Sequence, residues 1–181
     1  GDDTFILVGS EGNVVQNTGS ITDTSGTNTL HIVGTVDISQ MDISAELLAN
    51  IVMEAGSPSV LTFNPLQATQ ISSIVTTGTF TAPPIIVVTP PAVVGPIVFN
   101  PNFTISGTSS VNVEIPEGQT ASIPTSSGLG GISGGTATVT GNMTAAQVVA
   151  AGDSLADGYT VVDTASNIAE TLPENNLFKE T

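Results

Sequence analysis

The chain has 181 residues, of which 39% are hydrophobic and only 9% are charged, and its formal net charge is −15. One basic residue stands against 16 acidic ones, which excludes nucleic-acid binding, because neutralising phosphates requires Lys and Arg. The absence of cysteine excludes disulfides and thiolate metal sites. No apolar run reaches the roughly 20 residues that a membrane helix needs.

Short strand-like runs rich in Thr and Val recur along the whole chain. In the run that begins at Thr29, Leu30 and Ile32 alternate with other residues, as in a strand with one solvent-facing side. Gly and Asn between the runs favour turns. The expected strands lie at Thr4–Gly9, Thr29–Ser39, Ser59–Phe63, Ser73–Thr81, Phe103–Gly107, Ser110–Ile115, Thr136–Gly141 and Gly158–Asp163.

Four short stretches between these runs have helix-start signals, at 44–52, 65–72, 144–151 and 164–172. Asn64 followed by Pro65 and Gln67 is typical of a capping box with proline at the first helical position. Thr144 and Gln147 repeat the box further along the chain. Because helices this short are unstable alone, we expect them to rest on a sheet.

Strand and helical turn together form a degenerate repeat. The segments 44–56, 65–78 and 144–152 each combine a cap, a small apolar helix and a glycine beside a Thr/Val strand. Units of roughly twenty residues are typical of solenoids, whose coils stack to bury a shared core. The sequence therefore predicts an all-β fold of solenoid-like strand–turn units with a few short helices. A β-sandwich is the alternative, since alternating strands fit either architecture.

The proline-rich segment 82–101 divides the chain into three expected regions. It follows a β domain with strand–short-helix repeats at 1–81 and precedes a second β-rich region at 102–181. Proline cannot donate to a strand ladder and belongs at strand ends or edges. Exposed apolar runs between prolines mark an interaction surface. We expect the segment either to dock on the next copy or to connect two β-domains; the self-association residues are Ile85, Ile86, Val87, Val88, Val93, Val94, Ile97, Val98 and Phe99.

Two stretches resemble RTX-type (haemolysin-type calcium-binding) secreted bacterial surface proteins. The start, GDDTFILVG, resembles the last half-repeat of their Gly- and Asp-rich nonapeptide arrays, with Gly1, Asp2 and Asp3 matching the motif. The end, GYTVVDTASNIAETL, is similar to segments of RTX-associated adhesins and surface-layer-like proteins. The resemblance implies export by type I secretion and folding on Ca²⁺ outside the cell.

Calcium is accordingly the expected cofactor. Carboxylates on loops are the oxygen ligands that Ca²⁺ prefers. The candidate ligands are Asp2 and Asp3 at the start and Asp153, Asp157 and Asp163 around a glycine-containing loop. The other interpretation is that these acids are solvated loop residues and helix caps.

The sequence predicts that the protein is not an enzyme. His31 is the only histidine, and there is no partner set for nucleophilic or phosphoryl-transfer chemistry. The glycine-rich stretch Gly128–Gly135 lacks the lysine of a phosphate loop. Paired acids could hydrolyse glycosides, but the chain has no Trp and one Tyr to build sugar subsites.

Together these features predict an extracellular, secreted bacterial structural protein that self-associates into a filament, sheath or surface layer. Its main partners are copies of itself, with cell-surface or biofilm-matrix polysaccharide as a further partner. The alternative is a calcium-stabilised, non-polymerising module of a large RTX-type adhesin.

Overall fold

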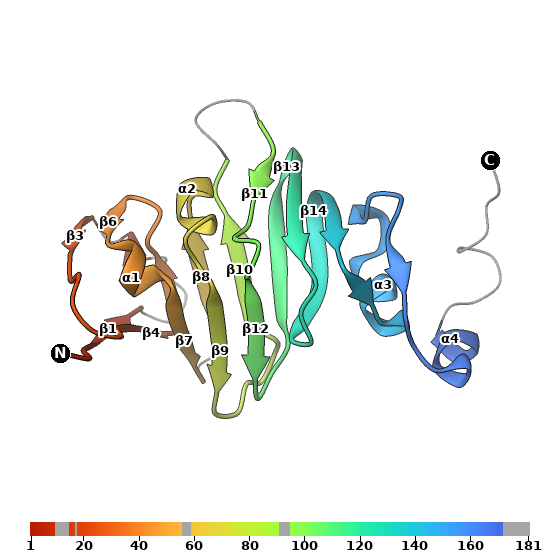
Figure 1. Ribbon diagram of the computed structural model, residues 1–181, viewed down its shortest axis with the longest axis horizontal. Helices are drawn as coiled ribbons and strands as arrows, with labels where there is room; N and C mark the ends of the chain where they lie inside the picture. Colours follow the sequence, from red (N-terminus) through yellow and green to blue (C-terminus); the bar gives the residue numbers. More distant parts are fainter. Residues whose placement is uncertain (10–14, 17, 56–58, 91–94, 172–181) are drawn as a thin grey trace.

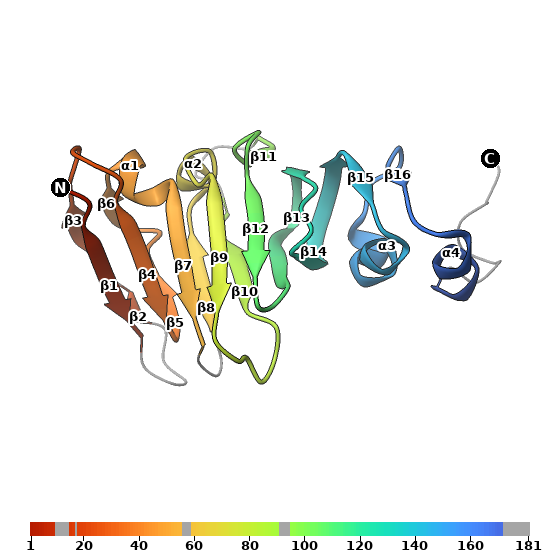
Figure 2. The ribbon, with the colours of Figure 1, turned by 60° about the horizontal axis from the view of Figure 1, so that its bottom comes forward.

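The computed structural model describes residues 1–9, 15–16, 18–55, 59–90 and 95–171. It is mostly strand (47%), and the parallel strands stack into a β-solenoid of about five turns (Figure 1). The predicted solenoid is confirmed, and the chain does not form the alternative β-sandwich. The stack begins at the N-terminus and ends with helix α4 (Ala165–Thr171) at the opposite end (Figure 2).

The first face of the solenoid is a five-stranded parallel sheet to which each coil contributes one strand. Leu30, Ile51 and Ile74 stand in register on neighbouring strands, and all three side chains are fully buried. This inward row is what the alternating sequence pattern predicts. In sheet order the strands are β1 (Thr4–Val8), β4 (Thr29–Val33), β7 (Asn50–Glu54), β9 (Ser73–Thr77) and β12 (Thr104–Gly107).

The second face is also a parallel sheet. Gly34 lies at the corner between β4 and the next strand of the chain, with a φ of 78°, a conformation that glycine adopts without strain. Val36, Leu61 and Ile86 form its inward row. The strands are β2 (Val15–Gln16), β5 (Thr35–Asp37), β8 (Val60–Phe63), β10 (Ile85–Val88), β11 (Ile97–Val98), β13 (Val111–Pro124) and β14 (Leu129–Thr140). β13 is long enough to pair with β10 through its first half and with β11 through its second.

The third side of the coils carries short strands and helical turns. β3 (Gly19–Ile21) pairs with β6 (Met41–Ile43). The helix α1 (Ala45–Leu48) follows β6 in the same coil, and α2 (Pro65–Ala68) lies in the next coil. Towards the C-terminus, α3 (Ala145–Ala151) packs on β14, a 3-10 turn spans Gly152–Ser154, and β15 (Asn142–Met143) pairs with β16 (Thr160–Val161). The helices, at most seven residues long, are all too short to serve as membrane spans in the described part of the chain.

Three phenylalanines fill the interior at one corner. The ring of Phe99 lies 6.1 Å from that of Phe63 and 5.1 Å from that of Phe103, centroid to centroid. All three side chains are essentially buried. Transferring a side chain of this size out of water contributes about 1.5–3 kcal/mol to the stability of the fold. The three rings therefore contribute much of the hydrophobic stabilisation between these coils.

Several predicted elements differ from the observed ones; the strand expected at Thr136–Gly141, for example, begins already at Leu129 as β14. The helix expected at 44–52 ends early, because Asn50 to Glu54 pairs with both neighbouring strands as β7. The segment 82–101 is not a linker between separate sheets: its strand β10 pairs with β8 on one side and with β13 on the other. The second sheet therefore runs across both expected region boundaries.

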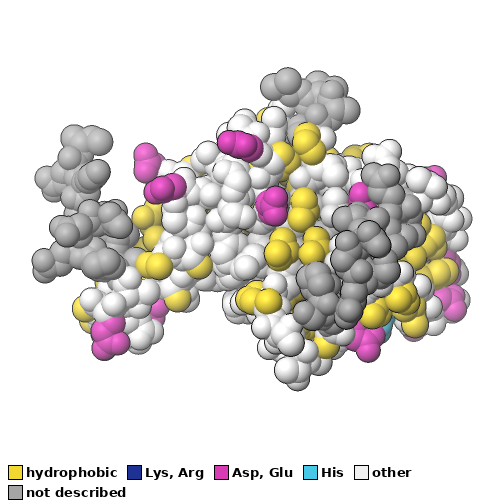
Figure 3. Space-filling view, turned by 180° about the vertical axis from the view of Figure 1, so that it is seen from behind, with side chains coloured by type: hydrophobic (Ala, Val, Ile, Leu, Met, Phe, Trp, Pro, Cys, Tyr) yellow, Lys and Arg dark blue, Asp and Glu magenta, His cyan; other side chains and the backbone are white. Residues whose placement is uncertain are grey.

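One face of the stack has few charged side chains. Figure 3 shows one face on which hydrophobic and acidic side chains are scattered among uncharged ones. His31 lies on the outward row of β4, where its Nδ1 is 4.0 Å from Glu54 Oε2, and is a surface strand residue as its position in the alternating run indicates.

Candidate functional site

The five predicted calcium ligands lie at opposite ends of the stack. Asp2 Oδ1 accepts the Thr27 N–H at 2.8 Å, which fastens the N-terminus to a neighbouring turn. Asp153 and Asp157 lie exposed at the other end, around the loop that precedes β16. Among the described residues, no three acidic or histidine side chains come close enough to hold a metal ion. Calcium binding stays a prediction.

Asp163 joins the last two coils through its carboxylate. Its carboxylate accepts the side-chain amide of Asn167 at 2.7 Å, the Thr164 N–H at 2.8 Å and the Ala145 N–H at 3.1 Å. The bond to Asn167, followed by those to Thr164 and Ala145, holds the pKa of Asp163 below its ordinary value of 3.8. Asp163 therefore binds the first turns of both α3 and α4, whereas the caps themselves are Thr144 and Thr164, whose hydroxyls accept the N–H groups of Gln147 and Asn167.

Replacing Asp163 by alanine should lower the melting temperature at neutral pH. In acid, the wild type and the variant should melt at the same temperature. Because the folded-state pKa is depressed, the carboxylate stabilises the fold above pH 3.8 and stops doing so as the pH falls through the lowered value. Melting curves of wild type and variant should therefore converge below pH 3.8. Asp157→Ala, at an exposed loop position, is the matched control. A difference that stays constant with pH would contradict the prediction.

The nine predicted self-association residues divide between core and surface. Ile86, Val88, Ile97 and Phe99 are at most 2% exposed, so they are packed inside the chain's own coils and are unavailable to another copy. For these four residues the docking interpretation is corrected: the prolines bracket strands of the core. Ile85 and Val87 are half-buried, Val98 is 48% exposed, and Val93 and Val94 lie outside the described residues.

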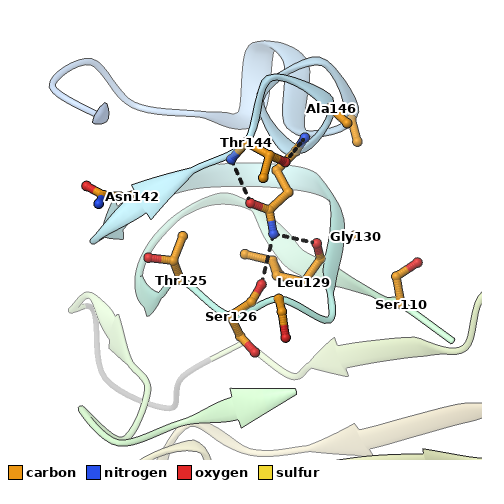
Figure 4. Close-up of a pocket in the computed structure, with 11 residues that line it drawn as sticks. Ser110, Thr125, Ser126, Leu129, Gly130, Asn142, Thr144 and Ala146 are labelled. Carbon is orange, nitrogen blue, oxygen red and sulfur yellow. Dashed lines mark hydrogen bonds between the residues drawn. The ribbon is translucent and has the colours of Figure 1, made fainter. Parts of the chain in front are cut away.

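A hollow of about 630 Å³ opens beneath α3 (Figure 4). Gln147 crosses it: its Oε1 accepts the Thr144 N–H at 2.9 Å, and its Nε2 donates to the carbonyls of Ser126 at 2.8 Å and Leu129 at 3.0 Å. The side chain thereby ties the helix to the coil below. Among the described residues that line the hollow, none has a charged side chain. Its hydroxyl-bearing lining residues are Ser110, Thr125, Ser126, Ser127 and Thr144.

At the N-terminal edge of the first sheet, half of the backbone groups of β1 point away from β4. The N–H of Thr29 donates to the carbonyl of Asp3 at 2.9 Å, and the N–H of Gly9 donates to that of Val33 at 2.8 Å. In a parallel ladder, alternate residues turn both backbone groups toward the same neighbour. The odd-numbered residues of β1 therefore bond to β4, and the even-numbered ones turn their backbone groups the other way.

This free edge is also apolar. Ile6 and Val8 are 60% and 67% exposed, although isoleucine and valine are normally buried. Phe5 and Leu7 point into the stack but are only partly buried, because β1 is the first strand of its sheet. Sequence reasoning missed these residues, although a run from Thr4 to Val8 without a charge or proline is a signal for an unprotected edge.

No protein-family model matches the chain, and no curated protein or solved structure matches it either. The strand pairing itself places the protein in the class of parallel β-solenoids.

Proposed function

We propose that the protein is an extracellular structural protein that associates with copies of itself into a filament, sheath or surface layer through the ends of its coil stack. The observation that supports this most directly is the outer edge of β1, with which no described strand pairs and on which Ile6 and Val8 are exposed. A strand edge of this kind is a template for pairing with another chain.

The ends of the stack favour association more than its flanks do. Monomeric proteins protect an edge strand with charge, proline, a bulge or a covering helix, and repeat proteins close their terminal units with a polar cap. β1 has none of the first three between Thr4 and Val8. At the other end of the described chain, α4 has no buried side chain, and β15 is the one described strand with which β16 pairs. Two such ends allow each copy to contact two neighbours.

The composition supports the extracellular setting and the end-on geometry. A net charge of −15 makes the flanks of two copies repel each other, whereas β1 itself is uncharged. One Lys or Arg in 181 residues leaves few sites for proteases that cut after basic residues, which suits a protein that persists outside the cell.

Negative-stain microscopy and sedimentation of the purified chain, each with Ca²⁺ and with EGTA, test the proposal. We expect regular assemblies whose length grows with protein concentration in the micromolar range. A single monomeric species at every concentration, in both conditions, would refute it.

The second candidate is a calcium-stabilised module of a larger RTX-type adhesin, favoured if a neighbouring coil of a longer chain covers the same open edge. It predicts monomers in the experiment above and a melting temperature that falls in EGTA. A ligand at 100 times its dissociation constant adds about 2.7 kcal/mol to the stability of the state it binds. Binding of cell-surface or matrix polysaccharide stays a prediction under either candidate.

A further inference from the structure

We propose that two copies of the chain pair through their β1 edges, antiparallel, across a two-fold axis at Ile6. This inference rests on the self-association proposed above and names one of its contacts. The contact uses the backbone groups of Thr4, Ile6 and Val8, which point away from β4, and the exposed side chains of Ile6 and Val8.

A second copy of β1 is the partner whose edge matches in length. The opposite edge of the first sheet, at β12, is already occupied at its centre. The Ser126 hydroxyl accepts the Ile105 N–H and donates to the Ile105 carbonyl, both at 2.7 Å, and the Gly128 N–H donates to the same carbonyl at 3.1 Å. Within the described part of this sheet, β1 is thus the strand with a fully free edge.

The antiparallel register satisfies every free group of the edge. With the two-fold axis at Ile6, this residue faces Ile6 of the second copy, and Thr4 faces Val8 of the second copy. Each of the three facing pairs exchanges two N–H···O bonds, about six in all. The same arrangement brings Phe5 and Leu7 of both copies together and covers the partly exposed end of each core.

Charge favours the antiparallel arrangement over a parallel one. Asp2 and Asp3 directly precede β1. In a parallel pair in register, Asp3 would lie beside Asp3 of the second copy, and like charges placed opposite each other destabilise a sheet. In the antiparallel pair these acids lie at opposite ends of the shared ladder, next to the uncharged Gly9 of the other copy.

A proline at position 6 tests the backbone contact. Ile6→Pro removes an N–H that points away from β4, so the monomer keeps its β1–β4 bonds, while two of the intermolecular bonds are lost. We expect the dissociation constant for pairing, measured by sedimentation, to rise about tenfold or more. Ile6→Thr, which keeps the N–H and the strand preference, should weaken pairing less. Far-UV circular dichroism of dilute protein should be unchanged for both.

A single cysteine at the same position tests the geometry independently of how proline is tolerated. The chain has no cysteine of its own, so Ile6→Cys introduces one thiol per copy. Facing residues of an antiparallel pair have Cα atoms about 5.5 Å apart, within the range that a disulfide bridges. Mild oxidation should yield covalent dimers. Val98→Cys, an exposed aliphatic position of similar accessibility far from the edge, should yield few.

The outcomes separate this inference from the proposed function. A wild type that assembles, an Ile6→Pro variant that assembles as well, and an Ile6→Cys variant that cross-links no more than Val98→Cys would refute the β1 contact and leave self-association standing. A wild type that remains monomeric would refute both.

Discussion

Replacing Ile86 by serine should destabilise the monomer by about 3–5 kcal/mol. Ile86 is fully buried in β10, in register with Leu61 on one neighbouring strand and Val113 on the other. The substitution leaves a cavity between these two side chains and places a hydroxyl where apolar side chains surround it. Both effects act on the folded monomer, so urea unfolding followed by circular dichroism should show a lower midpoint.

Val98→Ser is the matched control in the same proline-rich segment. Val98 is 48% exposed on β11, so its replacement should change stability by no more than about 0.5 kcal/mol. If Ile86→Ser instead kept the wild-type midpoint and abolished assembly, β10 would form an intermolecular surface and the assignment of this segment to the core would be wrong.

Replacing Gln67 by glutamate should cost a similar amount, about 3–5 kcal/mol at neutral pH. Gln67 is 4% exposed, and its Nε2 donates to the carbonyls of Ile38 at 2.9 Å and Met41 at 3.2 Å in the preceding coil. A carboxylate can still accept the Asn64 N–H, as Oε1 does now, but its second oxygen would face two carbonyl oxygens. The variant thus buries a charge opposite two acceptors.

The effect of Gln67→Glu should diminish in acid. Burial and the facing carbonyls raise the pKa of the introduced carboxyl, and once protonated it can donate one hydrogen bond again. Gln147→Glu is the matched control, since Gln147 makes the same three kinds of bond but is only partly buried, and its cost should be smaller. Equal midpoints for both variants at pH 7 would show that the carbonyl contacts of Gln67 contribute little.

Local patterns in the sequence were enough to predict the coil. Leu30 and Ile32 alternate with outward residues, and β4 buries them as expected. The two capping boxes predicted at Asn64 and Thr144 are both complete, because each depends only on residues three positions apart.

Contacts between distant residues decided what local patterns could not. Asn50 to Val52 continues an apolar helical ridge in the sequence, but pairing on both sides makes it a strand. Ile86 is core because β8 and β13 flank β10 on both sides. The same reasoning applies to the candidate site: the alternation of β1 looks like that of β4, and only the sheet order shows that one of its edges is free.

The direction of the interstrand bonds has a mechanical consequence. Strands in this stack run across the long axis, so their hydrogen bonds lie along it (Figure 2). Tension between the two ends therefore pulls coils apart face on and loads all bonds of a junction together. Among the described coils we expect the last junction to yield first, because only the two pairs of β15 with β16 and the single bridge between Ala137 and Leu155 hold it, whereas the long pairing of β13 with β14 resists. Under tension, the last described coil should therefore detach and unfold before the coils at the centre separate.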